Sequence, residues 1–198
     1  MTTWISRVGA ALLCCAGLAA CEGVDGSGGF LDALATSGAT KPARPPLTQA
    51  VMMRGGVTLV PPAGFCIDPY SLRQDFALMA RCDTLGANTG GRGAPLGLMT
   101  ASFTRSAAGA ALPSASDYAK AAGLAAPERQ RDAADHTVFA TRGTPPTPEL
   151  SDLHWRAVAR LGTYTMGVAL FGAEGKRALS IEGAGLVEDL IARTRSKT

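Results

Sequence analysis

Motifs that mark catalytic or cofactor sites are largely missing from this sequence. It contains only two histidines, and it has no Gly-x-Ser-x-Gly nucleophile elbow. The glycine-rich segment 86–97 lacks the Gly-Lys-Ser/Thr ending of a phosphate-binding loop, and Gly91-x-Gly93 has no third glycine at dinucleotide-binding spacing. We therefore expect segment 86–97 to be a plain loop, and we expect no cofactor.

Clustered positive charge is also missing. Of the 19 basic residues 15 are arginines, and nowhere do three basic residues follow one another. They are nearly balanced by 16 acidic residues. Proteins that bind nucleic acid or anionic membranes through charge concentrate Lys and Arg in runs or stripes. The sequence therefore argues against a nucleic acid partner and against a polybasic membrane patch.

The amino-terminal apolar segment, Val8–Ala20, is shorter than the roughly 20 residues that a membrane-spanning helix needs. It follows a short basic start containing Arg7 and ends in Leu18-Ala19-Ala20-Cys21, which matches the bacterial lipobox at all four positions. This pattern predicts a signal peptide over residues 1–20 and acyl chains such as palmitate on Cys21. The alternatives are a plain signal peptide and an uncleaved amino-terminal anchor.

Lipidation of Cys21 would hold the protein in the cell envelope, facing the periplasm, with the membrane as its partner through the anchor. Either the inner or the outer membrane is compatible with the sequence. Residues 21–50 are rich in glycine and proline and predict a flexible tether with a root-mean-square span of roughly 30 Å. Residues 51–198 are numerous enough for a single folded domain.

Two cysteines remain once Cys21 is acylated and Cys14 and Cys15 leave with the signal peptide. Export would place Cys66 and Cys82 in an oxidising compartment, where paired thiols normally form disulfides. A metal site would need two further ligands, and a redox pair usually has Cys-x-x-Cys spacing. We therefore predict a disulfide between Cys66 and Cys82.

The pattern of apolar residues predicts an α+β domain with a mostly antiparallel sheet. A short helix capped by Ser114 is expected in the middle, and a helix with one apolar face is expected at the end. Gly162-Thr163 suits a type II′ hairpin turn, and a strand over 177–182 would complete a three-stranded meander. The strands are expected at 57–60, 76–82, 96–104, 137–142, 154–161, 164–172 and 177–182. The apolar face of the last helix comprises Leu186, Val187, Leu190 and Ile191.

Val60-Pro-Pro-Ala-Gly-Phe-Cys-Ile-Asp-Pro69 resembles a stretch found in uncharacterised envelope proteins of alphaproteobacteria. More broadly, the order of elements over residues 51–196 is similar to that of the PsbP/DcrB-like α/β sandwich. This resemblance implies an exported or lipid-anchored domain without a shared catalytic site. The Cys66–Cys82 pair is not part of the general pattern of that group.

Ser151, Asp152 and His154 bring a hydroxyl, a carboxylate and an imidazole together within four residues, as a hydrolase would require. Working triads usually draw these groups from separate segments, with an oxyanion hole nearby. We expect instead the end of a loop with a local Ser or Asp turn.

Asp132, Asp135 and His136, together with His154, could form an open metal site. Their spacing matches no closed metal-site pattern, so we expect a solvated turn and no bound metal. The aromatic residues of the meander are expected in the core or at its edge rather than as a ligand platform: Trp155, Tyr164 and Phe171.

Together these features predict a membrane-anchored envelope lipoprotein with a non-catalytic domain that binds or scaffolds an envelope protein. The alternative is a hydrolase or metal-binding accessory protein that uses His136 and His154. On the first hypothesis, replacing either histidine with alanine should cost at most about 1 kcal/mol, as for most surface positions.

Overall fold

A computed structural model describes residues 44–88, 91–107 and 110–196 of the chain. The predicted signal peptide, Cys21 and most of the predicted tether lie outside the described residues. The described residues belong to one compact unit of the chain, Thr40–Thr198. Within the described part, no helix is both long enough and apolar enough to cross a membrane.

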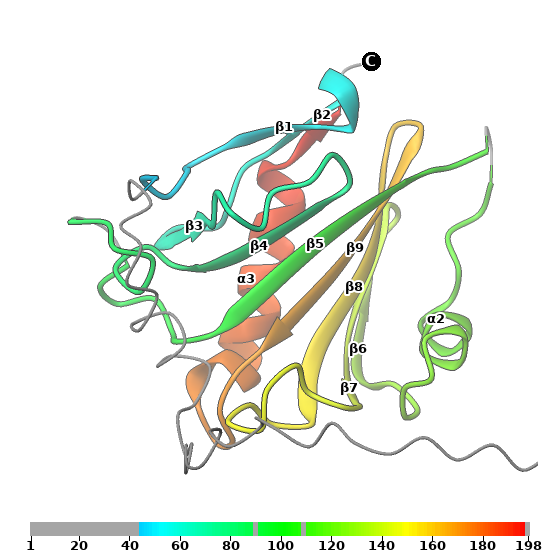
Figure 1. Cartoon of the computed structure of the whole chain (residues 1–198). Helices are drawn as coiled ribbons and strands as arrows, with labels where there is room; N and C mark the ends of the chain where they lie inside the picture. Colours follow the sequence, from blue (N-terminus) through cyan, green and yellow to red (C-terminus); the bar gives the residue numbers. More distant parts are fainter. Residues whose placement is uncertain (1–43, 89–90, 108–109, 197–198) are drawn as a thin grey trace, which may run out of the picture. The chain divides into compact units, whose positions relative to one another are not determined.

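Seven strands form one antiparallel sheet in the order β3-β4-β5-β9-β8-β7-β6 (Figure 1). The predicted α+β class with a mostly antiparallel sheet is therefore confirmed. The strands are β3 (Phe65–Ile67), β4 (Phe76–Arg81), β5 (Leu98–Arg105), β6 (Glu128–Asp132), β7 (His136–Arg142), β8 (Leu153–Leu161) and β9 (Tyr164–Phe171).

A second, smaller sheet has the order β1-β2-β10, with β1 at Ala50–Met52, β2 at Val57–Leu59 and β10 at Arg195–Ser196. The short helix η1 (Met53–Gly55) joins β1 to β2. Before β1, the backbone of Leu47 exchanges two hydrogen bonds with that of Ile67, at 3.0 and 2.8 Å. The fold thus begins before residue 51, the boundary expected from the sequence, because these earlier backbone groups are already paired.

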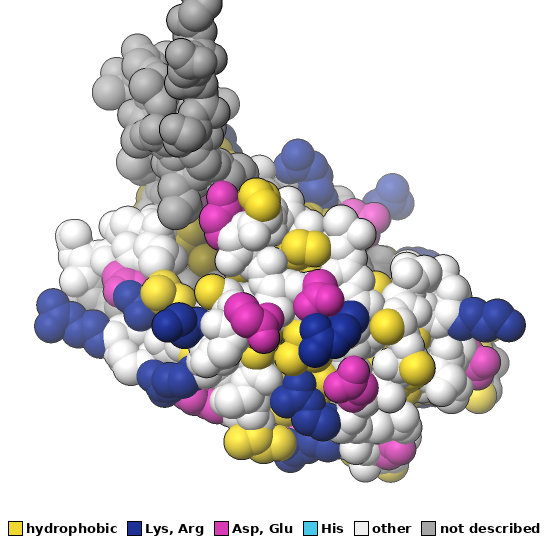
Figure 2. Space-filling model, turned by 90° about the horizontal axis from the view of Figure 1, so that it is seen from below, with side chains coloured by type: hydrophobic (Ala, Val, Ile, Leu, Met, Phe, Trp, Pro, Cys, Tyr) yellow, Lys and Arg dark blue, Asp and Glu magenta, His cyan; other side chains and the backbone are white. Residues whose placement is uncertain are grey.

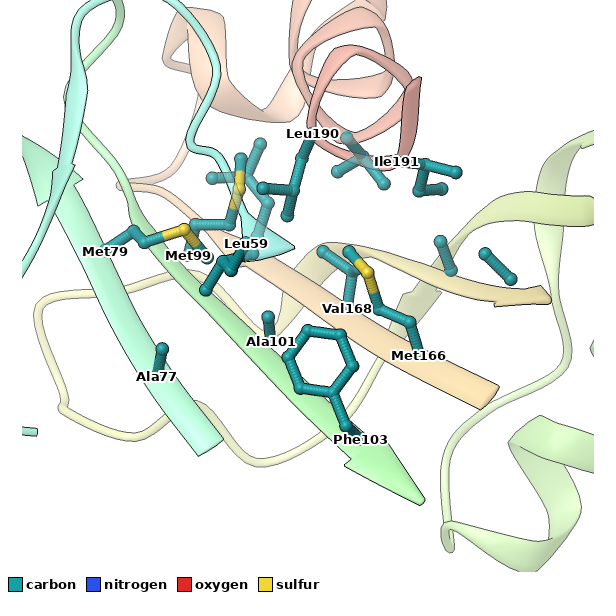
Figure 3. Packing of buried hydrophobic residues seen from close by; sticks show 14 of the residues in the cluster. Leu59, Ala77, Met79, Met99, Ala101, Phe103, Met166, Val168, Leu190 and Ile191 are labelled. Atoms are coloured by element: carbon teal, nitrogen blue, oxygen red, sulfur yellow. The ribbon is translucent and has the colours of Figure 1, made fainter. Parts of the chain in front are cut away.

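The main core lies between the large sheet and the carboxy-terminal helix α3 (Ile181–Arg193), as Figure 3 shows. Alternate residues of each central strand face α3, because successive side chains of a strand point to opposite faces. Val187, Leu190 and Ile191 are buried against this face and Leu186 is partly buried. The predicted apolar face of the last helix is therefore confirmed.

The other face of the sheet, which we call the outer face, carries the short helix α2 (Ala115–Ala121). The Ser114 hydroxyl accepts a hydrogen bond from the Asp117 backbone N–H at 3.1 Å and caps the first turn, as expected. Tyr118 packs edge-on against Phe139 of β7, with ring centroids 6.1 Å apart. A small second core forms under the helix from Ala115, Ala119 and Phe139.

The β8–β9 hairpin turns at Gly162, whose φ of +59° is the positive value that the first central position of a type II′ turn requires. The strand expected over 177–182 is absent, however. Arg177–Leu179 forms the short helix η2, and α3 starts directly after Ser180. The Ser180 hydroxyl accepts from the Glu182 backbone N–H at 3.2 Å, and this cap begins a helix where the sequence suggested a strand.

Cys66 and Cys82 form a disulfide, with Cα atoms 4.8 Å apart. Cys66 lies in β3 and Cys82 directly follows β4, the strand that pairs with β3. The predicted pairing is therefore confirmed, and the bond ties the edge strand of the sheet to its neighbour.

Reduction of this disulfide should lower the free energy of unfolding by about 3 kcal/mol, the chain-entropy value for a loop of this length. Urea unfolding of the oxidised and reduced protein measures the difference. Alkylation of denatured, unreduced protein should modify neither Cys66 nor Cys82. Two alkylated thiols in protein isolated without reductant would contradict the bond.

Candidate functional site

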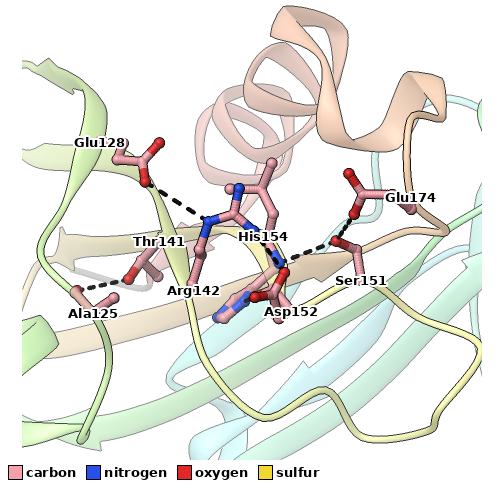
Figure 4. A network of polar contacts seen from close by, with 9 residues as sticks. Ala125, Glu128, Thr141, Arg142, Ser151, Asp152, His154 and Glu174 are labelled. Carbon is pink, nitrogen blue, oxygen red and sulfur yellow. Dashed lines mark hydrogen bonds and ion pairs between the residues drawn. The ribbon is translucent and has the colours of Figure 1, made fainter.

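The Ser151-Asp152-His154 segment forms a local turn rather than a catalytic triad (Figure 4). The Ser151 hydroxyl accepts from the Leu153 backbone N–H at 3.1 Å and is also hydrogen-bonded to the Glu174 carboxylate. The His154 Nδ1 lies 2.8 Å from the Asp152 carbonyl oxygen. Because the serine is bonded to the Glu174 carboxylate and the histidine to the backbone, His154 is not placed to act as the base of a Ser-His-Asp triad.

The same end of the sheet is held by a network of structural contacts (Figure 4). The Arg142 guanidinium bonds to the Asp152 carboxylate at 2.7 Å and lies 4.0 Å from that of Glu128. The Thr141 hydroxyl donates to the Ala125 carbonyl oxygen at 2.8 Å. These contacts join β7 to the segments before and after it.

His154 is a core residue with a relative exposure of 0%, so the expectation of a surface histidine is wrong here. Its ring stacks on that of Phe171, with centroids 4.5 Å apart and planes 23° apart. In the β8 pattern His154 lies on the outer face, where neighbouring side chains cover it. Its replacement with alanine should therefore cost more than the small loss expected from the sequence.

Burial is the main cause that lowers the pKa of His154, and the positive charge of Arg156 lowers it further, against the opposing hydrogen bond to Asp152. The ring is therefore neutral in the folded protein near pH 7. Since Nδ1 faces a carbonyl oxygen, that nitrogen carries the proton. The other nitrogen, Nε2, is buried and has no hydrogen-bond partner among the described residues.

A neutral buried histidine makes stability depend on pH. Because the folded pKa lies below the unfolded value of about 6.5, the unfolded chain binds more protons as the pH falls. The contribution of His154 is fully present above about pH 6.5 and is lost as the pH falls toward the folded pKa. His154→Gln should flatten this part of a plot of unfolding free energy against pH. An unchanged slope in His154→Gln would contradict the assignment.

The residues of the possible metal site do not come together. His136 pairs with Ala159 across β7 and β8, whereas His154 pairs with Thr141, so the two histidines lie five positions apart along β7, roughly 17 Å. The Asp135 carboxylate is 2.8 Å from His136 Nδ1, and Asp132 accepts hydrogen bonds from its own neighbours. Within the described ranges, no three His, Cys, Asp or Glu side chains cluster as metal ligands would.

The meander aromatics are buried, as expected. Trp155, Tyr164 and Phe171 are each less than one-tenth exposed. The Trp155 indole donates to the Ser180 carbonyl oxygen at 3.0 Å, which satisfies its buried N–H. These rings therefore serve packing rather than ligand binding.

Arg156 is a polar residue for which the sequence predicted no role. It follows the buried Trp155 and points to the outer face, where its guanidinium lies 5.6 Å from the centre of the Phe171 ring. Tyr118 is its hydrogen-bonding neighbour on α2, and burial lowers the pKa of Arg156. Its Nε is buried without a partner, and no described carboxylate forms an ion pair with it.

Two hydroxyl groups flank a small residue beside Arg156. A Cβ placed on Gly167 would lie 2.9 Å from the Ser102 Oγ and 3.3 Å from the Tyr118 hydroxyl oxygen. Arg156 is itself next to Tyr118, so three hydrogen-bonding side chains gather on one part of the outer face. We call Arg156, Tyr118 and Ser102 the Arg156 cluster. The Ser102 hydroxyl donates to the Gly167 carbonyl oxygen at 3.4 Å, which leaves the guanidinium and the Tyr118 hydroxyl as the donors that suit an anionic group.

The outer face beyond α2 is open among the described elements. α2 packs on β7 and β8, and no described helix lies in front of β4 and β5 in Figure 1. Ser102 and Thr104 of β5 are exposed, while Leu78 and Thr100 are half-buried. The Arg156 cluster thus lies where the covered part of the outer face meets the open part.

Comparisons with known proteins give likeness at the level of fold alone. No protein-family model matches the chain, and no curated protein matches it in sequence. The Ran-binding protein Mog1p of Saccharomyces cerevisiae is 12% identical with a TM-score of 0.48, over 75% of this chain and 94% of that one. A Mog1 point mutant is 13% identical with a TM-score of 0.49, again over 75% of this chain and 94% of that one. Cyanobacterial PsbP from Synechocystis sp. PCC 6803 is 11% identical with a TM-score of 0.45, over 79% of this chain and 96% of that one.

Proposed function

We propose that this protein is a membrane-anchored envelope lipoprotein whose domain is a non-catalytic binding module. Its partner on this proposal is an envelope protein that places an acidic side chain on the Arg156 cluster. The observation that supports this proposal most directly is the Arg156 guanidinium, which is half-buried, has hydroxyl groups nearby and has no acidic partner among the described residues. The resemblance of residues 60–69 to alphaproteobacterial envelope proteins supports the same cellular setting.

The lack of a carboxylate beside Arg156 among the described residues favours a ligand. Taking a charge out of water costs free energy, and most buried guanidiniums recover that cost through a carboxylate. Arg156 has instead a phenol and an aromatic ring beside it. A carboxylate supplied by a partner would accept hydrogen bonds from the guanidinium and from the Tyr118 hydroxyl.

The openness of the surface favours a protein partner over a small molecule. Small molecules usually bind in concave pockets that enclose most of their surface. The region around Ser102 and Thr104 is instead exposed sheet, with hydroxyl and half-buried apolar side chains that fit a broad contact. Figure 2 shows the lower end of the molecule, where basic and acidic side chains are interspersed. Over the whole chain 19 basic residues face 16 acidic ones, so recognition would depend on local groups such as Arg156 rather than on a field of one sign.

The anchor is tested by Cys21→Ser. The precursor should remain uncleaved and should no longer incorporate labelled fatty acid, because the modified sulfur is gone. Labelling in cells, followed by electrophoresis of the immunoprecipitated protein, reads both effects at once. Normal labelling and processing of Cys21→Ser would show that the anchor is elsewhere.

The binding function is tested by crosslinking in intact cells, followed by purification through a carboxy-terminal tag. We expect one envelope protein whose recovery falls about tenfold or more in Arg156→Gln. Arg193→Gln is the matched control, because Arg193 lies on α3 at the other side of the sheet. Replacing the acidic residue of the partner should cause the same loss. Equal recovery with wild type and Arg156→Gln would contradict the proposal.

A further inference from the structure

A cavity of about 380 Å³ lies where three segments distant in sequence meet. Met53 and Arg54 come from η1, Gln74 and Asp75 from the segment before β4, and Arg105 from the end of β5. Figure 1 shows η1 at the upper end of the molecule. The volume falls in the range of small-molecule sites. The cavity is open to solvent, because its polar lining residues, Arg54, Gln74, Asp75 and Arg105, are exposed and only Met53 is half-buried.

Backbone hydrogen bonds hold the walls of this cavity in place. The Met53 N–H donates to the Gln74 carbonyl oxygen at 2.8 Å, and the Arg54 N–H donates to the Gln74 side-chain oxygen at 2.8 Å. The Phe103 N–H donates to the Asp75 carbonyl oxygen, also at 2.8 Å. The backbone of all three segments is thus fixed before any ligand arrives, so binding has to order only the exposed side chains.

The backbone at the rim is strained. Met53 and Arg54 have φ values of +52° and +56°, in the left-handed region that side chains other than those of glycine, asparagine and aspartate rarely adopt. Two such residues in succession cost free energy, and such costs are common at ligand sites. Both strained residues, Met53 and Arg54, line the cavity.

The cavity has an excess of positive charge. Arg54 and Arg105 face it with Asp75, and none of these three forms an ion pair with another described residue. The Arg105 guanidinium lies 5.6 Å from the centre of the Tyr164 ring, a contact that positions it without neutralising it. Two guanidiniums can together hold one oxyanion, while the carboxylate accepts from a donor on the same ligand.

We propose that this cavity binds a small organic oxyanion, a carboxylate or a phosphate ester, that also carries a hydroxyl or ammonium group. Arg54 and Arg105 bind the oxyanion and Asp75 accepts a hydrogen bond from the donor group. Met53 forms the apolar wall. The cavity is lined by residues other than the three of the Arg156 cluster.

Isothermal titration of the full mature protein in detergent tests the site with three probes: L-glutamate, glycerol 3-phosphate and glycerol. At least one of the two anions should bind saturably with a Kd below about 10 mM and raise the melting temperature, and glycerol should not bind. A response to glutamate alone identifies a carboxylate site, and a response to glycerol 3-phosphate alone identifies a phosphate site.

Arg54→Gln and Arg105→Gln should each weaken the bound anion about tenfold or more. Arg73→Gln is the control, since Arg73 is the residue before Gln74 but its guanidinium bonds to the Tyr70 and Leu72 carbonyl oxygens instead. It should bind like wild type. The proposal is overturned if neither anion binds saturably below about 10 mM, or if both cavity variants bind as tightly as wild type.

Discussion

Gly183→Ala should destabilise the protein by about 3 kcal/mol or more, one of the largest single-residue effects in the domain. A Cβ at this position would stand 1.8 Å from the Ala178 carbonyl oxygen and 2.9 Å from the Trp155 Cδ1. Both neighbours are fixed, one as backbone of η2 and the other as a fully buried indole. Relief would require α3 to move away from the sheet, which would break the main core contact.

Gly185→Ala is the matched control in the same helix. Its Cβ would meet no atom within 4 Å, so this change should stabilise α3 by up to about 1 kcal/mol through helix propensity alone. Urea unfolding of the two variants and the wild type gives the three free energies. If Gly183→Ala were as stable as Gly185→Ala, the close packing of α3 on β8 would be wrong.

Arg156→Met should make the protein more stable while it loses the partner. The methionine side chain can lie against Phe171 as the arginine stem does, and it removes a charge that is half-buried without a described acidic partner. We expect the free energy of unfolding to rise by about 1 kcal/mol or more. Partner recovery should fall as in Arg156→Gln, because a thioether offers no donor.

The control for this pair of effects is Arg193→Met. Arg193 lies in the exposed last turn of α3, so its replacement should change stability by no more than about 0.5 kcal/mol and leave partner recovery intact. Opposite changes in stability and binding are typical of residues kept for function. A clear loss of stability in Arg156→Met would mean that the guanidinium serves the fold instead.

The elements that the sequence predicted are those with strong local patterns. Tyr164, Met166, Val168 and Leu170 alternate and form β9, and the Ser114 cap begins α2 where expected. β6, at Glu128–Asp132, had no such pattern. All of its residues are exposed, so no alternation of apolar side chains marks it, and a left-handed Arg129 with φ of +47° interrupts its register with β7.

The missing strand at 177–182 has a similar explanation. Leu179 and Ile181 alternate as in a strand, but they belong to two different helices, with Ser180 between them as the cap. A serine such as Ser180 occurs both as the cap of a helix and on the exposed face of a strand, so the sequence alone does not distinguish the two. Only the packing of α3 on the sheet, which needs Gly183, decides between them.

The candidate site depends on tertiary contacts that no local pattern records. Arg156 alternates with apolar residues along β8, as an ordinary solvent-facing arginine would. Its burial comes from Tyr118, on α2, and Phe171, on β9. Phe171 also covers His154, so the expectation of a surface histidine was wrong for the same reason.

Site-specific photocrosslinking from position 102 tests the central claim most directly, because Ser102 is the exposed member of the Arg156 cluster. A photoreactive residue there should crosslink to an envelope protein in intact cells, and the crosslink should disappear when Arg156→Gln is added. The same residue at position 185, exposed on α3, should give no such product. Absence of a crosslink from position 102, or an equally strong one in the Arg156→Gln background, would contradict a binding function for this face.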